Sequence, residues 1–160
     1  MSPERFIDHV RVEQESLRRF LLALCGGDAS LADDIAQDAL VRAYVASGSF
    51  LGLSKFSTWL FRIAYNCYVY HCRKPRLETV PSDTKQALSV LSSDETDSGF
   101  RHQRLYLALE SLPEKEKACI ALHYFEDRSI KEISSILQIP QGTVKYYLCS
   151  GRNHLKSILQ

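Results

Sequence analysis

The sequence of 160 residues lacks any apolar run close to the roughly 18 residues that a membrane-spanning helix needs. Its first ten residues include Glu4, Arg5 and Asp8, which is atypical of a secretory signal peptide. Hydrophobic residues make up 45% of the chain and charged residues 24%, a balance that is ordinary for a folded protein. We therefore expect a soluble, cytoplasmic protein.

Cysteines in paired motifs are also missing. The chain has 5 cysteines, an odd number, and no Cys-x-x-Cys, so a disulfide framework is not expected. No second ligand pair with zinc-like spacing accompanies His71-Cys72, and no paired carboxylate, nucleophile constellation or phosphate-binding loop is present. We expect no metal, no cofactor, no small-molecule substrate and no catalysis. A thiol or metal sensor centred on His71 and Cys72 is the alternative, which a metal assay would test.

Strong charge of one sign is absent as well, because the formal net charge is only +1. The charge is nevertheless unevenly distributed. Residues 1–76 carry 10 basic and 8 acidic side chains, residues 77–100 carry 1 and 5, and residues 101–160 carry 9 and 6. Phosphate neutralisation supplies most of the affinity of a free-standing DNA-binding protein. Two weakly basic ends around an acidic middle therefore fit modules that need a protein partner on DNA.

The pattern of apolar residues predicts helices throughout, since no alternating strand pattern persists. The helical rhythm breaks at residues 77–100, which contain Pro81, Gly99 and the polar run SSDETDSG. The sequence therefore predicts an all-α protein of two small helical domains, 1–76 and 101–160, joined by a flexible acidic linker.

The first informative helix follows Gly26-Gly27, where Asp28 and Ser30 are both candidates for the N-cap. Small and apolar residues at helical spacing predict one buried face, formed by Ala32, Ile35, Ala36, Ala39, Leu40, Ala43 and Tyr44. A second stripe, in which two of the four residues are acidic, points elsewhere and consists of Asp34, Gln37, Asp38 and Val41. Such a stripe is typical either of a solvated face or of a docking face for a basic partner helix, and periodicity does not separate the two.

A second helix is predicted from about residue 54 to 74. Its buried side is expected to hold Phe56, Trp59, Leu60, Ile63, Ala64 and Cys67. Its opposite side interleaves aromatic and basic residues and consists of Arg62, Tyr65, Asn66, Val69 and Arg73. Bases stack on rings while cations follow phosphates, so this face favours single-stranded DNA, with Tyr65 and Asn66 as the preferred contacts. The alternative is that the aromatic residues of this helix form a core cluster instead of contacting DNA, and Phe56 and Trp59 are expected to belong to that cluster. The glycines of the preceding loop, 47–53, allow close backbone approach.

The third informative segment predicts a helix-turn-helix. Ser129 and Glu132 have the spacing of a capping box, the turn falls at 138–140, and a longer helix follows from about Gln141. The outward face of that helix is basic and polar and consists of Lys145, Tyr146, Cys149, Arg152 and Lys156. No acidic residue occurs from 133 to 160. Such a second helix enters the major groove of DNA, whereas an ordinary helical hairpin is the alternative.

Three segments in this order resemble the extracytoplasmic-function (ECF, group four) branch of the bacterial sigma factors. ADDIAQDALVRAY (32–44) is similar to the core-binding helix of that family, and FSTWLFRIAYNCYVYHCRK (56–74) is similar to the element that follows it. LESLPEKEKACIALHYFEDRSIKEISSILQIPQGTVKYYLCSGRNHL (109–155) resembles region four. The resemblance covers about residues 5–158, with only the linker unplaced.

The resemblance implies a factor that binds core RNA polymerase and directs promoter recognition, DNA melting and transcription initiation. The first domain would dock on the clamp helices of the β′ subunit through Asp34, Gln37, Asp38 and Val41. It would bind and open the −10 element with the loop 48–55 and the residues Ser49, Phe50, Arg62, Tyr65, Asn66 and Arg73. The second domain would grip the β flap and read the −35 element through Thr143, Lys145, Tyr146, Cys149, Arg152 and Lys156. The acidic linker would pass near the template channel, and an anti-sigma factor is an expected partner.

The chain departs from the family pattern on and before the recognition helix. Tyr147 and Ser150 stand where basic residues are common, Gln138 stands where the turn glycine is usual, and Ser134 replaces the typical alanine. These changes weaken the expected phosphate contacts. A helix-turn-helix regulator, or a sigma-like decoy acting through an anti-sigma factor, is therefore the alternative function, and transcription with core polymerase would separate them.

Overall fold

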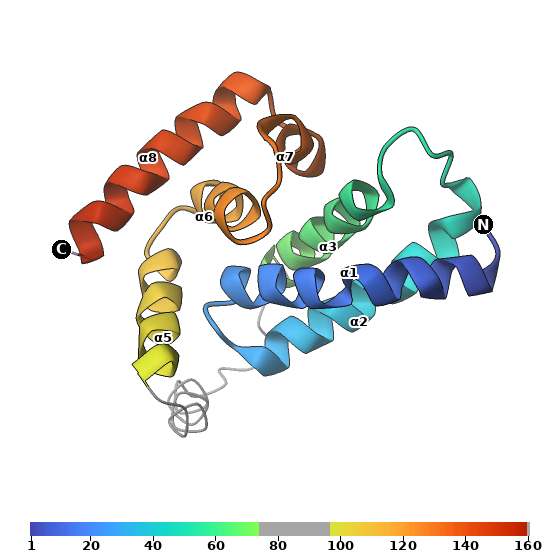
Figure 1. Ribbon diagram of the computed structural model, residues 1–160, viewed down its shortest axis with the longest axis horizontal. Coiled ribbons are helices and arrows are strands. Elements are labelled where there is room, and N and C mark those ends of the chain that lie inside the picture. The colour runs from blue at the N-terminus through green and yellow to red at the C-terminus, as the bar shows by residue number, and fades with distance from the viewer. Residues whose placement is uncertain (74–96, 160) are drawn as a thin grey trace.

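The computed structural model describes residues 1–73 and 97–159, which contain helices and turns but no strand (Figure 1). The all-α fold predicted from the sequence is confirmed. Most of the predicted linker lies outside the described residues. Helix α5 begins at Asp97, four residues before the predicted start of the second domain. Gly99 suggested a break, but a glycine in a helix costs only about 1 kcal/mol and helices tolerate it.

The first module consists of α1 (Pro3–Leu24), α2 (Ala29–Ala46), the short turn η1 (Ser47–Ser49) and α3 (Phe56–Arg73). Gly26 and Gly27 reverse the chain between α1 and α2 with positive φ angles of 65° and 86°. Asp28 then caps α2 by accepting a hydrogen bond from the Leu31 amide at 3.1 Å. The fully buried face of α2 consists of three alanines and one isoleucine: Ala32, Ile35, Ala39 and Ala43. The small side chains of the alanines let α1 and α3 approach α2 closely.

The second module consists of α5 (Asp97–Glu110), α6 (Glu114–Ile120), the π-helical turn η2 (Ala121–Phe125), α7 (Ile130–Leu137) and α8 (Gln141–Leu159). The predicted capping box is present. The Glu132 amide donates to the Ser129 hydroxyl at 3.1 Å, and the Ser129 amide donates to the Glu132 carboxylate at 3.3 Å. Gln138 ends α7 in the left-handed conformation, with a φ of 57°. Helices α7 and α8 therefore form the predicted helix-turn-helix.

The two modules pack against each other along a seam, which we define as the contacts of α1 and α3 with α5, α6, η2 and α7. Figure 1 shows α1 crossing the second module beside α6, while α3 extends toward α7. The buried apolar side chains of both modules belong to one cluster. Helix α3 is therefore covered by α1 and α2 on one side and by the second module on another.

Two predictions about the buried faces are wrong in detail. Tyr44, which was expected to face inward, is half exposed, and Tyr65, which was expected to face outward, is buried. Tyr44 still contacts the ring of Phe6 with its edge, at a centroid distance of 5.4 Å. Of the helices in the described ranges, none has both the length and the apolar character required to cross a membrane.

Candidate functional site

The acidic stripe of α2 lies on the surface of the first module. Asp34 and Gln37 are exposed, as is Val41. Asp38 is less free, because its carboxylate accepts a hydrogen bond from Arg42 at 3.0 Å and lies 3.4 Å from the Nε2 atom of His71. Burial acts to raise the pKa of Asp38, but the hydrogen bonds and charges of Arg42 and His71 outweigh it and hold that pKa below its usual value. Asp34 and Gln37 are therefore the polar groups of the stripe most open to a partner.

The same surface of α2 carries apolar side chains that the sequence analysis missed. Val45 is 79% exposed and follows Val41 by one helical turn, with Tyr44 beside it. Tyr70 of α3 is also exposed, and the guanidinium of Arg42 lies 5.5 Å from the centre of its ring. The four-residue spacing of Val41 and Val45 is the sequence signal that could have predicted these exposed apolar side chains. The docking candidate is consequently a mixed acidic and apolar face.

The loop between η1 and α3 is anchored at its base and exposed at its tip. The Phe50 ring lies 5.0 Å from Trp59 and 6.0 Å from Phe56, so it belongs to an aromatic cluster. Leu51 and Leu53 are 78% and 90% exposed, and the sequence analysis did not single them out. Exposed leucines in a loop of this kind are available to contact an apolar or aromatic group. Ser49 is exposed, and its hydroxyl donates to the Ala46 carbonyl at 2.7 Å.

Asn66 is exposed on α3, as predicted, and it borders a hollow between α2 and α3. The hollow has a volume of about 300 Å³ and is lined by Arg42, Ala46, Ile63, Asn66 and Cys67. Its lining combines an amide, a cation and apolar groups. Such a combination suits a flat heterocycle with hydrogen-bonding edges.

The other predicted contacts on α3 differ in their surroundings. Burial raises the pKa of Tyr65 to about 12, and its side chain is only 7% exposed, so it belongs to the core. Arg62 donates to the carbonyl and hydroxyl oxygens of Ser135 at 2.9 and 2.6 Å. Arg73, at the end of α3, is exposed. The interface with the second module, which the sequence pattern does not show, accounts for the contacts of Arg62.

On α8 the predicted outward face is present. Its exposed side chains are Lys145, Tyr146, Cys149, Arg152 and Lys156. Thr143 is half-buried near the start of the helix. Arg152 donates to the hydroxyl of Tyr124, an exposed residue of η2 that the sequence analysis missed, at 3.1 Å. The face carries cations and no carboxylate, which is the composition that duplex DNA requires.

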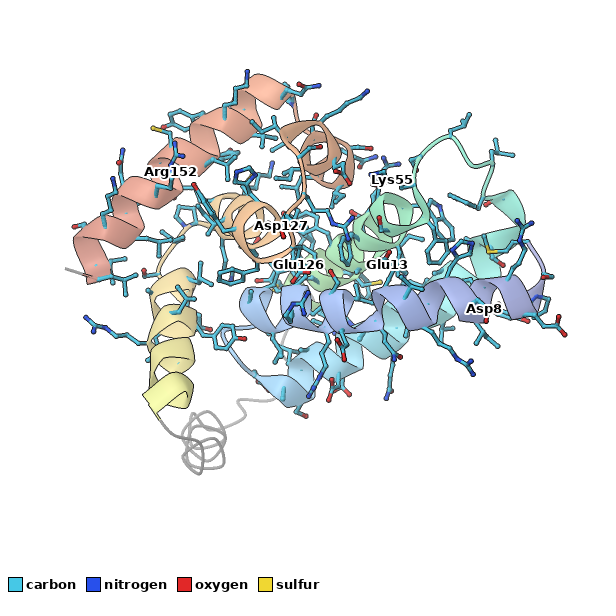
Figure 2. The ribbon with its side chains drawn as sticks, in the orientation of Figure 1. Asp8, Glu13, Lys55, Glu126, Asp127 and Arg152 are labelled. Atoms are coloured by element: carbon cyan, nitrogen blue, oxygen red, sulfur yellow. The ribbon has the colours of Figure 1, made fainter. Side chains whose placement is uncertain are left out.

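The seam is held by charged groups that are largely buried. The Glu126 carboxylate, whose side chain is 1% exposed, accepts hydrogen bonds from Arg19 at 3.0 and 3.1 Å and from the Ser16 hydroxyl. Lys117 is buried and donates to the Leu24 carbonyl at 2.7 Å and to the Tyr68 hydroxyl at 3.2 Å. Each of these bonds joins α1 or α3 to the second module. In Figure 2, Glu126 and Glu13 are labelled where α1 meets the second module.

Arg128 adds another contact across the seam. Its guanidinium donates to the Ser57 hydroxyl at 2.9 Å, lies 3.4 Å from the Glu13 carboxylate and is 4.7 Å from the centre of the Phe61 ring. Near it, Lys55 lies 4.0 Å from Glu132. Charged and polar contacts therefore cross the seam beside the apolar cluster that the two modules share. Among the described residues, no group of three or more His, Cys, Asp or Glu side chains is placed to hold a metal ion.

Comparison with known proteins covers both modules. Residues 8–77 match the family described as Sigma-70 region 2, and residues 102–155 match the family described as Sigma-70, region 4. The chain is 33% identical to the ECF RNA polymerase sigma factor SigW of Bacillus subtilis, over 98% of this chain and 90% of the relative. It is 32% identical to the ECF RNA polymerase sigma-E factor of Escherichia coli K12, over 79% of this chain and 73% of the relative.

Solved structures show the same fold. The sigma factor RpoE of Bartonella quintana, in complex with the anti-sigma factor NepR, superposes with a TM-score of 0.77 at 23% identity, covering 98% of this chain and 97% of RpoE. CnrH, in complex with the cytosolic domain of CnrY, gives a TM-score of 0.75 at 22% identity, covering 99% and 89% of the two chains. Both modules and their order are thus matched, and the chain belongs to the ECF branch of the sigma-70 family, whose members direct promoter recognition and transcription initiation.

Proposed function

We propose that the chain binds core RNA polymerase through α2 and divides the promoter between its modules, the first capturing unpaired −10 strand and the second reading −35 duplex. One observation carries this proposal. The mixed acidic and apolar face of α2 and the basic face of α8 are both exposed, and they belong to different modules. A factor that must reach polymerase and chromosome acts in the bacterial cytoplasm.

Docking on polymerase rests on Asp34, Gln37, Val41 and Val45. Carboxylate and amide groups beside exposed apolar side chains fit a basic helical surface with an apolar stripe, such as the clamp helices of β′ that the family resemblance implies. Asp38 contributes to the negative face while it holds Arg42 and His71 in place. The second module would contact the β flap. Because RpoE of Bartonella quintana is solved in complex with the anti-sigma factor NepR, we also propose an anti-sigma partner for this chain.

Capture of the −10 strand rests on the hollow at Asn66 and on the loop that ends at α3. An extruded base would place its hydrogen-bonding edge against Asn66, while Leu51 and Leu53 contact neighbouring bases. Ser49 and Phe50 anchor the start of this loop to the protein. Arg73 is available to a phosphate.

Reading of the −35 element rests on Lys145 and Arg152, which lie two helical turns apart on one face of α8. Tyr146, Cys149 and Lys156 extend this face, and Thr143 lies near the helix N-terminus, where phosphates bind. Tyr65, being buried, takes no part in the proposed contacts.

The seam must open for both modules to act together. Elements centred about 10 and 35 base pairs upstream lie about 85 Å apart along B-DNA, at roughly 3.4 Å per base pair. A folded chain of this length has a radius of gyration of only about 15 Å. Opening would also release Arg62 from Ser135 and make it available to the strand.

Replacing Asp34 with arginine tests the docking site. Like charges placed against a basic surface cost several kcal/mol, so binding to core polymerase should weaken by at least about tenfold. Asp8→Arg is the matched control, because it makes the same charge change at an exposed position on a different helix, α1. Equal polymerase affinities of the two variants and the unaltered protein, in fluorescence anisotropy titrations, would show that the docking site lies elsewhere.

A further inference from the structure

A buried carboxylate on α6 connects that helix to α8, the proposed recognition helix. Glu116 lies on α6, and its side chain is 6% exposed. Its Oε1 atom accepts a hydrogen bond from the Ser150 hydroxyl at 2.6 Å, and its Oε2 atom accepts one from the Nδ1 atom of His154 at 2.9 Å. Both donors belong to α8, so one side chain of α6 binds two successive turns of the helix that carries the basic face.

The α8 backbone also packs tightly against α6 between these two bonds. Gly151 is buried there, and a Cβ atom at this position would lie 2.8 Å from Cγ1 of Ile120. The distance is shorter than any normal carbon contact, so α8 rests directly on α6. The glycine thus fixes how close the two helices lie, whereas it does not fix how α8 is rotated about its own axis.

Rotation about the axis of α8 decides which side chains face the DNA. Successive residues of a helix differ by about 100°, so Ser150 and His154 lie about 140° and 180° from Lys145, on the opposite side of the helix. Val144 and Leu148 pack α8 through apolar contacts, which are not directional. Hydrogen bonds require defined distances and angles, so the two bonds to Glu116 restrict the rotation where apolar packing does not.

Small rotations matter at the surface of the helix. Side chains end roughly 5–6 Å from the axis, so a rotation of about 15° moves them by about 1.5 Å. A hydrogen bond to a base edge tolerates only about 0.5 Å. A well-packed apolar residue in place of a buried charge is often as stable or more stable, so stability alone does not explain why a carboxylate occupies this position.

We propose that Glu116 is a positioning residue for −35 recognition, which fixes the rotation of α8 through Ser150 and His154. The proposal rests on the reading of duplex DNA by α8. It also explains Ser150, which stands where the family commonly has a basic residue. At that position the hydroxyl binds Glu116 and holds the recognition helix on the side that faces α6.

Two substitutions separate positioning from packing. Glu116→Gln keeps the shape and can still hydrogen-bond to both partners, whereas Glu116→Met keeps the volume and loses both bonds. Glu114→Met is the control, since it removes an exposed carboxylate from the same helix. The probe is the promoter that unaltered holoenzyme selects from a pool randomised over the −35 block, together with its single-base variants.

We expect Glu116→Met to lower the discrimination between selected and substituted −35 sequences by about tenfold, which corresponds to one good base contact. Glu116→Gln and Glu114→Met should keep this discrimination within about twofold of that of the unaltered protein. In the free protein, spin labels on Cys72 and Cys149, both exposed, should show a shifted or broadened distance distribution in Glu116→Met alone.

Two outcomes overturn the proposal in distinguishable ways. If Glu116→Met keeps both the discrimination and the spin-label distance while Lys145→Ala or Arg152→Ala loses discrimination, α8 reads the duplex but Glu116 does not position it. If Lys145→Ala and Arg152→Ala also leave the discrimination unchanged, the reading of the −35 element by α8 is itself wrong.

Discussion

Replacing Arg19 with methionine removes the main partner of Glu126 at the seam. The Glu126 side chain is 1% exposed, and without Arg19 it keeps, among the described residues, only the Ser16 hydroxyl as a side-chain partner. Breaking a buried ion pair by removing one partner costs about 3–5 kcal/mol, because the remaining charge is left uncompensated. The Arg19 side chain is 56% exposed, so solvent already screens part of this interaction, and we expect a cost of about 2 kcal/mol. That cost corresponds to a shift of roughly 30-fold toward the open arrangement.

Arg18 supplies the matched control. It is the neighbouring arginine, and it pairs with Asp33 at 3.3 Å, where both side chains are more than half exposed. Such surface pairs contribute less than about 1 kcal/mol, so Arg18→Met should leave the seam closed. Dyes on Cys72 and Cys149 report the separation of the modules by single-molecule energy transfer, because the remaining cysteines are buried. Identical distributions for Arg19→Met and Arg18→Met would refute the reasoning that buried charge pairing holds the modules together.

Two further predictions concern the helix-turn-helix. Gly151→Ala should destabilise the protein by about 1–3 kcal/mol through overpacking against Ile120, whereas Gly142→Ala, with no atom near the added methyl group, should be neutral or slightly stabilising, as chemical denaturation will show. Gln138→Gly should raise the free energy of unfolding by about 0.5–1 kcal/mol, because Gln138 has a φ of 57°, a conformation in which glycine carries no steric cost. An unchanged or lower unfolding free energy would mean that the glutamine side chain stabilises this turn.

Much of the local structure follows from residue spacing. The capping box of Ser129 and Glu132 was predictable because its two residues lie three apart in sequence, whereas the sequence left the N-cap of α2 open between Asp28 and Ser30, of which Asp28 is the cap. The exposed face of α8 followed from helical periodicity in the same way. The left-handed turn at Gln138 could be located, since the family places a glycine there, although glutamine is not the residue that such a turn favours.

The seam was not predictable, because its bonds join residues that are far apart in the chain. Nothing in the sequence pairs Arg19 with Glu126 or Arg62 with Ser135. The error about Tyr65 has the same origin. On an isolated amphipathic helix its position faces outward, but the packing of α3 within the folded protein buries it. Glu116 was overlooked for a related reason, since an acidic residue at the start of a helix is usually assigned to the helix dipole.

The division of labour between the modules is the central claim, and permanganate footprinting of promoter opening tests it most directly. The comparison uses holoenzymes carrying Asn66→Ala or Lys145→Ala, on a promoter that the unaltered holoenzyme opens, with gel shifts of the closed complex in parallel. We predict that Asn66→Ala binds the closed promoter almost normally, opens it slowly and is partly rescued by a pre-melted −10 bubble. Lys145→Ala should bind poorly, and the bubble should not restore its binding. Normal opening by Asn66→Ala, together with a Lys145→Ala defect confined to melting, would contradict the account by reversing the two roles.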